Sequence, residues 1–292
     1  MKFAVFTAAT PDWTPEQAAS TLAAQGWDGI EWRVTDQQEA PADDPIPGFW
    51  AGNRATWPLT GLESHLDEIA RITKDAGLAF SGIGGYVRCF DHENTERMLA
   101  ATAVLGAPRV RVTMPQLGTG NYRDLFAGAR DDLEWVAERA AHHGVQAVVE
   151  LHHGTITASA SAALRLVEGL DPAHIGVIHD CGNLVYEGYE DYLSAFELLG
   201  EYLAHVHVKN VAWRKQTDEG ADGAAVWRAD WASLRGGQVD VDAYFTALAE
   251  FGYNGWVTLE DFCTELPLER RTADDLAYLA GSWQRAVSSR DS

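Results

Sequence analysis

Four stretches in the second half of the chain run from apolar residues into side chains that bind metals or move protons. Taken singly, such residues have plain explanations, because an acid after a strand often caps the next helix and a lone histidine is usually structural. Four of them at the ends of successive stretches argue for a shared site. The stretches end in Glu150-Leu151-His152-His153, in His179-Asp180, in His205-Val206-His207 and in Glu260-Asp261.

Strand periodicity selects one residue from each stretch. His205 and His207 are two residues apart, so they share one strand face, and His207 is nearer to the strand end. Glu260 continues the inward parity of Thr258, whereas Asp261 faces the opposite side. The resulting candidate set is Glu150, Asp180, His207 and Glu260.

Three carboxylates and one imidazole form a set of mostly hard ligands. Such a set favours Mn²⁺ and also admits Mg²⁺, Co²⁺ or Zn²⁺. Three negative charges crowded together are strongly unfavourable without a cation, so the acidic cluster itself argues for a metal. We therefore expect one divalent metal ion as the cofactor.

These side chains require a scaffold that brings four strand ends to one rim. Short β-branched or aromatic stretches alternate with amphipathic ones along the whole chain, and glycine follows several of the amphipathic stretches, where a helix is expected to end. The alternation predicts an α/β fold, a (β/α)8 TIM barrel that forms a single domain over residues 1–292, with its active site at the carboxyl ends of the strands. The competing fold, a doubly wound nucleotide-binding sheet, should show a GxGxxG turn after its first strand, and the sequence has none there. The expected strands, each with its following helix, are Lys2–Thr7 and Pro15–Gln25, Gly29–Val34 and Gly61–Ala76, Leu78–Tyr86 and His92–Leu105, Arg109–Met114 and Tyr122–His143, Val145–His153 and Ser159–Gly169, Ile175–Asp180 and Tyr189–Leu199, Leu203–Asn210 and Val241–Phe251, and Gly255–Phe262 and Leu268–Val287.

Two expected loops, Thr35–Leu59 and Val211–Gln238, are unusually long and rich in tryptophan. Both follow strands, so both should lie on the active-site face of the barrel. Their flat aromatic rings suit the faces of sugars. An equal alternative is that they seal the loops against the barrel or against a second subunit, which leaves a homo-oligomer open. The tryptophans are Trp50, Trp57, Trp213, Trp227 and Trp231.

Composition narrows the classes of partner. The 292 residues include 22 Lys and Arg against 43 Asp and Glu, a formal net charge of −21. So acidic a surface argues against nucleic acid and anionic membranes as partners. No apolar stretch is long enough to span a membrane, and the start of the chain does not resemble a secretory signal. Cys89, Cys181 and Cys263 lie far apart and are expected as reduced thiols of a cytoplasmic protein.

The strand ends, taken together as Glu … Asp-x-x-(His/Asn) … His-x-His … Glu, resemble the sugar phosphate isomerase/epimerase family of xylose isomerase-like barrels. The family includes ketose 3-epimerases, hydroxypyruvate isomerase and inosose dehydratase. Residues 26–31, Gly-Trp-Asp-Gly-Ile-Glu, and the closing residues 251–261 add to the resemblance, which covers essentially the whole chain.

The resemblance implies roles for individual residues. The four residues of the candidate set match the family's metal ligands, and Glu150 and Glu260 also match the carboxylates that move protons on opposite faces of the substrate. Two positions depart from the ketose epimerases. Asn183 stands where many of them carry a substrate-contacting histidine, and Trp213 stands where they carry an arginine.

The expected activity is a metal-dependent isomerase or epimerase of a small sugar or keto-sugar, which abstracts a proton next to a carbonyl and forms a metal-stabilised enediolate. The alternative is a lyase or dehydratase on an inosose or 3-keto-glycoside, in which His152 or His153 protonates the leaving group. A DNA-repair endonuclease would need a His-rich rim and a basic groove, and a non-catalytic sugar-binding barrel would bind without metal. Lys209 is either a substrate contact or a structural partner of the acidic rim. The expected substrate-binding residues are Glu31, Arg111, His153, Asn183, Lys209 and Trp213.

Overall fold

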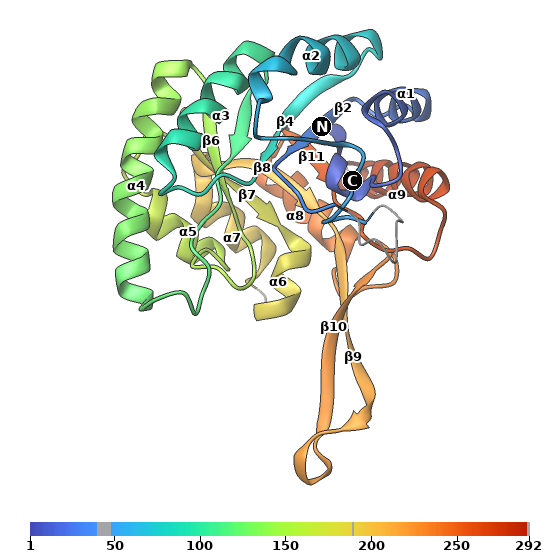
Figure 1. Cartoon of the computed structure of the whole chain (residues 1–292). Helices are drawn as coiled ribbons and strands as arrows, with labels where there is room; N and C mark the ends of the chain where they lie inside the picture. The colour runs from blue at the N-terminus through green and yellow to red at the C-terminus, as the bar shows by residue number, and fades with distance from the viewer. Residues whose placement is uncertain (40–47, 189, 291–292) are drawn as a thin grey trace.

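A computed structural model describes residues 1–39, 48–188 and 190–290 and shows a closed barrel of parallel strands inside a layer of helices (Figure 1). Each strand of the ring pairs in parallel with the next, and β11 pairs with β1 to close it. A short strand, β3 (Thr56–Trp57), pairs in parallel with the last two residues of β2. The predicted TIM barrel is confirmed. The strands of the ring are β1 (Lys2–Phe6), β2 (Gly29–Val34), β4 (Ala79–Gly85), β5 (Arg109–Arg111), β6 (Gln146–Glu150), β7 (Ile175–Asp180), β8 (Leu203–Val208) and β11 (Trp256–Leu259).

The strands are buried on both faces because helices cover their outer side and their own inward-pointing side chains fill the barrel interior. Every residue of β2 and of β7 is buried, as is typical of parallel sheets. The helices begin and end where local chemistry permits, as in the first of them, which starts with a capping box between Thr14 and Gln17 and ends at Gly26 with a φ of 94°. The helices are α1 (Pro15–Gln25), α2 (Leu66–Asp75), α3 (His92–Leu105), α4 (Tyr122–His143), α5 (Ala160–Val167), α6 (Cys181–Glu187), α7 (Tyr192–Leu199), α8 (Val241–Phe251) and α9 (Leu268–Ser288).

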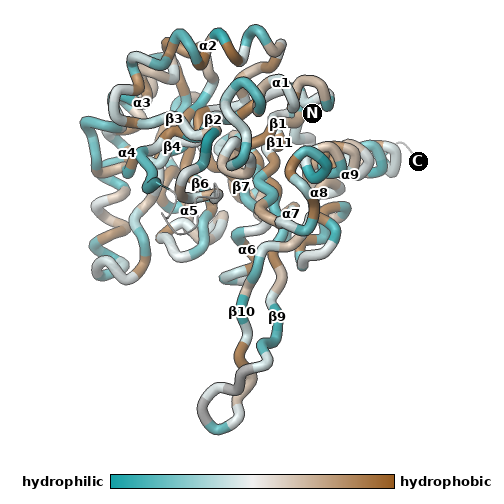
Figure 2. The backbone as a smooth tube through the Cα atoms, turned by 45° about the vertical axis from the view of Figure 1, so that its right-hand side comes forward, coloured by the Kyte–Doolittle hydropathy of each residue, from teal (hydrophilic) through white to brown (hydrophobic). Residues whose placement is uncertain are grey.

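The segment Val211–Gln238, expected as a loop, is mostly a β-hairpin, so that prediction was wrong. Strands β9 (Asn210–Glu219) and β10 (Ala225–Ala232) pair in antiparallel and project well away from the barrel, as both views show (Figures 1 and 2). Asp222 and Gly223 at the tip both have positive φ values, 59° and 75°. These two residues lie in the loop 220–224 between the strands, and an Asp-Gly pair is a hairpin signal that the sequence contained.

The connection between β7 and β8 also differs from the prediction of one helix over Tyr189–Leu199. Two helices are present, and α6 begins directly after β7 because the Asp180 side chain accepts a hydrogen bond from the backbone N–H of Asn183 at 3.0 Å. Tyr189 lies outside the described residues, as do residues 40–47 of the first long loop.

All three cysteines are free and buried, as expected. Within the described ranges, no helix combines the length and the apolarity that crossing a membrane requires.

Candidate metal centre and active-site cavity

The strand ends bring the four candidate ligands together at the rim of the barrel. Glu150 and Asp180 end β6 and β7, His207 lies one residue before the end of β8, and Glu260 follows β11 directly. One ligand atom from each residue lies within 4.8 Å of all the others, and all four side chains are buried. The structure thus contains a compact cluster of three carboxylates and one imidazole.

The ring of His207 is oriented by a carboxylate on its far side. Its Nε2 lies 3.2 Å from Oε2 of Glu31. Its Nδ1 lies 3.2 Å from Oε1 of Glu260 and 3.7 Å from Oε1 of Glu150, yet this buried nitrogen has no hydrogen-bond partner. A carboxylate that holds the far nitrogen of an imidazole, with the near nitrogen turned toward acids, is the usual surrounding of a metal-binding histidine. Burial lowers the pKa of His207, but the charges of Glu31 and Glu260 outweigh burial and raise it well above its usual value.

Lys209 places a positive charge on the same carboxylates. Its Nζ lies 2.6 Å from Oδ2 of Asp180, 2.6 Å from Oε2 of Glu260 and 3.8 Å from Oε1 of Glu150. The lysine stem packs against α6, where a Cβ on Gly182 would lie 2.4 Å from Lys209 Cγ, so that position has room only for glycine. Of the two roles expected for Lys209, the contacts favour the structural partner of the acidic rim.

The three carboxylates differ in how easily they lose a proton. Burial raises the pKa of Glu260, but Lys209 and His207 outweigh it and bring the pKa to about 2. Burial also raises the pKa of Glu150, but the charge of Arg111 and several further interactions outweigh burial and hold this pKa well below its usual value. The pKa of Asp180, by contrast, rises to about 7, because burial and the charges of Glu260 and Glu150 outweigh Lys209.

Glu150 is held by side chains from two neighbouring segments. Arg111 donates to its Oε2 at 2.6 Å, and Asn183 donates to its Oε1 at 3.1 Å. Asn183 also lies 2.9 Å from Nδ1 of His153, whose ring stacks on Tyr186 at 3.8 Å between centroids. These contacts make Asn183 a residue that supports Glu150 from behind.

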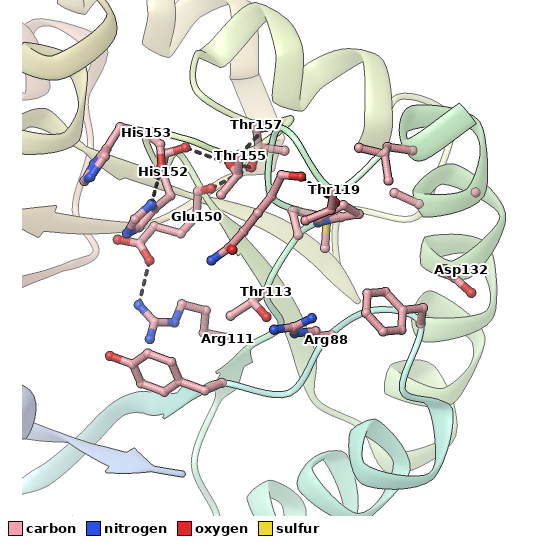
Figure 3. Close-up of a pocket in the computed structure, with 18 of the residues that line it drawn as sticks. Arg88, Arg111, Thr113, Thr119, Asp132, Glu150, His152, His153, Thr155 and Thr157 are labelled. Carbon is pink, nitrogen blue, oxygen red and sulfur yellow. Dashed lines mark hydrogen bonds and ion pairs between the residues drawn. The ribbon is translucent and has the colours of Figure 1, made fainter. Parts of the chain in front are cut away.

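A cavity of about 740 Å³ opens in front of the cluster (Figure 3). Five of the expected site residues line it, and aromatic residues lie beside them, of which Tyr86 and Phe262 were not expected there. Four further expected residues do not line the cavity and lie buried behind its wall: Glu31, Asp180, Asn183 and His207. The five expected residues are Arg111, His153, Glu150, Lys209 and Glu260, and the aromatic residues at this inner end are Trp50, Tyr86, Trp231 and Phe262.

Four of the tryptophans of the two long segments divide between the two roles weighed for them, whereas Trp227 does not line the cavity and is 54% exposed. Trp231 and Trp50 line the cavity. Trp213 does not, because its ring turns toward α6 and its Nε1 donates to the backbone oxygen of Val185 at 2.8 Å. Trp57 is buried in the core. The pairing of Trp231 with Val211 at the base of the hairpin, next to the barrel, explains why Trp231 and not Trp213 reaches the cavity.

Comparisons with known proteins agree with this fold. A model of the xylose isomerase-like TIM barrel family matches residues 19–281. An inosose dehydratase from Lacticaseibacillus casei is 30% identical over 132 residues, and the alignment covers 44% of this chain and 44% of that protein. The crystal structure of 3-keto-D-glucoside 4-epimerase, YcjR, from E. coli has a TM-score of 0.70 at 18% identity and covers 96% of this chain and 99% of the other. The crystal structure of the IolI protein with a zinc atom has a TM-score of 0.71 at 16% identity and covers 98% of this chain and 99% of the other. At these identities the solved structures establish the fold, and the chain aligns with less than half the length of the curated relative.

Proposed function

We propose, from the premise that the chain belongs to the family of xylose isomerase-like TIM barrels, that it is a divalent-metal-dependent isomerase or epimerase of a small sugar or keto-sugar. The observation that carries the proposal is the cluster of Glu150, Asp180, His207 and Glu260 at the inner end of the cavity. Enzymes that move a proton next to a carbonyl need both a group that takes the proton and a positive charge that stabilises the resulting anion.

The residues present fit a divalent ion. The donor set is hard, the Nδ1 of His207 is buried without a hydrogen-bond partner, and Glu31 holds the other face of that ring. Glu150, Asp180, His207 and Glu260 would hold the ion, for which we propose Mn²⁺, while the IolI structure contains zinc. When bound, such an ion acts as a Lewis acid that polarises the substrate carbonyl and stabilises negative charge beside it.

Glu150 and Glu260 are the proposed proton carriers. Both line the cavity, and both have lowered pKa values that keep them deprotonated and able to accept a proton at neutral pH. One carboxylate takes the proton from the carbon next to the carbonyl. An epimerase returns a proton to the opposite face of that carbon, and an isomerase returns it to the neighbouring carbon. Arg111 and Asn183 keep Glu150 in place during this exchange.

A lyase or dehydratase remains the second candidate because of one specific feature. His152 and His153 both line the cavity on the Glu150 side, and their rings stack at 4.6 Å between centroids. A histidine there could protonate a departing hydroxyl or alkoxide after the same proton abstraction. The resemblance to inosose dehydratase supports this alternative.

The same proposal includes the domain organisation, the location and the partners of the protein. We assign a single domain over residues 1–292, a cytoplasmic location and a small sugar or keto-sugar as the partner. The net charge of −21 supports the exclusion of nucleic acid and anionic membrane surfaces. A homo-oligomer is compatible with the exposed hairpin.

Metal analysis combined with solvent exchange tests the proposal. Purified protein should contain about one divalent ion per chain and should incorporate deuterium from D₂O into an intact keto-sugar. Glu150→Gln and Glu260→Gln should each reduce exchange by about 10²–10⁴-fold, the usual contribution of a general base. Glu134→Gln, on the exposed side of α4, is the matched control. An unsaturated or cleaved product would select the lyase instead, and full turnover in chelator would refute both candidates.

A further inference from the structure

The cavity continues well past the candidate metal centre, toward helix α4. Asp124 and Asp132 of that helix line its far wall, eight residues apart, which is about 12 Å along a helix. Figure 3 shows Glu150 and Asp132 at opposite ends of the view, with Thr113 and Arg88 between them. We call this far part the outer arm and define it by the lining residues Arg88, Phe90, Gln116, Thr119, Asp124 and Asp132.

The size of the cavity exceeds what one sugar ring needs. Its volume of about 740 Å³ lies in the upper part of the range of about 300–1,000 Å³ that takes drug-sized ligands. A single ring at the carboxylates is smaller than such a ligand and would leave the outer arm to water.

The outer arm has the chemistry of a site for a second ring. Phe90 is 52% exposed, and the guanidinium of Arg88 lies 5.7 Å from the centroid of its ring. An exposed aromatic face offers stacking to a flat partner, and Gln116 and Thr119 offer hydrogen bonds at its edges. The carboxylates of Asp124 and Asp132 line the same arm, which disfavours a phosphate or another anion beside Arg88.

We infer that the substrate is a glycoside with two rings, in which the reacting keto-sugar lies at Glu150 and Glu260 and a second, uncharged ring lies in the outer arm. The inference rests on the proposed function and specifies its substrate class. In this arrangement the linking oxygen lies near Thr113, which lines the cavity between Glu150 and Asp132. The second ring is either another sugar or a phenol, since both present a flat face and polar edges.

Three probes that share one reacting ring test the inference: methyl, phenyl and glucosyl 3-keto-D-glucosides. With the wild-type protein, kcat/KM for deuterium exchange or elimination should be about tenfold higher for the phenyl or the glucosyl compound than for the methyl one, as one added aromatic contact allows. Phe90→Ala and Arg88→Ala should bring this ratio toward one. Tyr122→Ala, which removes a neighbouring exposed aromatic residue outside the cavity, should keep it.

The outcomes separate this inference from the function on which it rests. Equal kcat/KM for all three probes, or a preference that survives both Phe90→Ala and Arg88→Ala, overturns the two-ring substrate and leaves the proposed function standing. If no probe reacts, the proposed function fails for this substrate class, and calorimetric binding of the same probes decides the inference. Tighter binding of a two-ring probe that Phe90→Ala abolishes supports it, and equal or absent binding overturns it. The ring that gives the larger ratio identifies the second unit as a phenol or a sugar.

Discussion

Lys209 lies among buried acids at the centre of the site, where its ammonium is 2.6 Å from both Asp180 and Glu260. Buried carboxylates without a cation would destabilise the fold, because moving a charge out of water is costly unless it is paired. The lysine therefore supplies internal charge balance, and a divalent ion at the same acids would have to share them with it.

Replacing Lys209 by methionine should expose this balance. In chelator, Lys209→Met should lose about 3–5 kcal/mol of unfolding free energy, the usual cost of breaking a buried pair. Divalent metal should restore much of the loss. Thermal or urea unfolding with and without Mn²⁺ measures both effects, with Lys74→Met on the exposed surface of α2 as control. A variant as stable as the wild type in chelator would contradict this account.

Glu31 was expected to contact substrate, whereas the structure places it behind His207. Glu31→Gln should therefore weaken metal binding by about 10–100-fold, as the loss of such supporting carboxylates usually does. KM measured at saturating metal should stay within about twofold, since the residue does not line the cavity. Calorimetric metal titration beside Glu68→Gln, a surface control, measures the difference. A large rise in KM with unchanged metal affinity would restore the substrate-binding role.

At the scale of elements, β7 and α8 are joined through a buried histidine. Nδ1 of His179 lies 2.9 Å from the hydroxyl of Tyr244 in α8, and burial lowers the pKa of His179 to about 3. In the unfolded chain this imidazole regains its ordinary pKa of about 6.5. Protonation therefore favours the unfolded state at every pH between these two values.

This linkage predicts a pH dependence of stability with a definite sign. The contribution of His179 is complete above about pH 6.5 and falls by about 1.4 kcal/mol per pH unit as the pH decreases toward 3. His179→Asn should remove that slope from the urea midpoints measured between about pH 4 and 6.5. His142→Asn, at the exposed end of α4, should retain it. Identical slopes in both variants would contradict the prediction.

The hairpin of β9 and β10 is the element least supported by the barrel. An isolated two-stranded ribbon is only marginally stable in water, so its outer half should open more readily than the barrel. Limited trypsin digestion should cut first at Arg214 or Lys215 and leave the remaining barrel intact. Mass spectrometry of the first fragments tests this, and an initial cut within the barrel helices would show that the hairpin is protected, for example by a second subunit.

At the scale of the whole molecule, the sequence predicted the barrel and its acidic rim for one physical reason. Parallel strands of a closed barrel all end at the same face, so locating the ends of β6, β7, β8 and β11 also brought Glu150, Asp180, His207 and Glu260 together. Which residues support these acids, and which residues line the cavity in front of them, depends on packing between segments that are far apart in the sequence. Asn183 and Trp213, which the sequence suggested as substrate contacts, therefore do not line the cavity, whereas Tyr86 and Phe262, which it did not suggest, do. The hairpin was missed because its Asp-Gly turn lies in a stretch whose polar and aromatic residues also suit a loop.

Removal of the ion should affect the stability of the entire barrel, since its proposed ligands come from four strands. A ligand that binds only the folded state at 100 times its Kd adds about 2.7 kcal/mol. The thermal midpoint should therefore rise with Mn²⁺ concentration and return to its starting value in chelator. Scanning calorimetry measures the shift, and the Glu150→Gln variant should show a smaller one. A midpoint that does not respond to any divalent metal would argue against the proposed centre.

Because its three native cysteines are buried, the molecule is suited to selective labelling of a cysteine introduced at its surface. Burial raises the pKa of Cys89 to about 12 and raises the pKa of Cys181 and of Cys263, so none of them should react readily with a maleimide at neutral pH. A single cysteine introduced at the exposed hairpin tip by Asp222→Cys would then be the only reactive thiol. A fluorophore attached there would report on subunit association by energy transfer without altering any native cysteine.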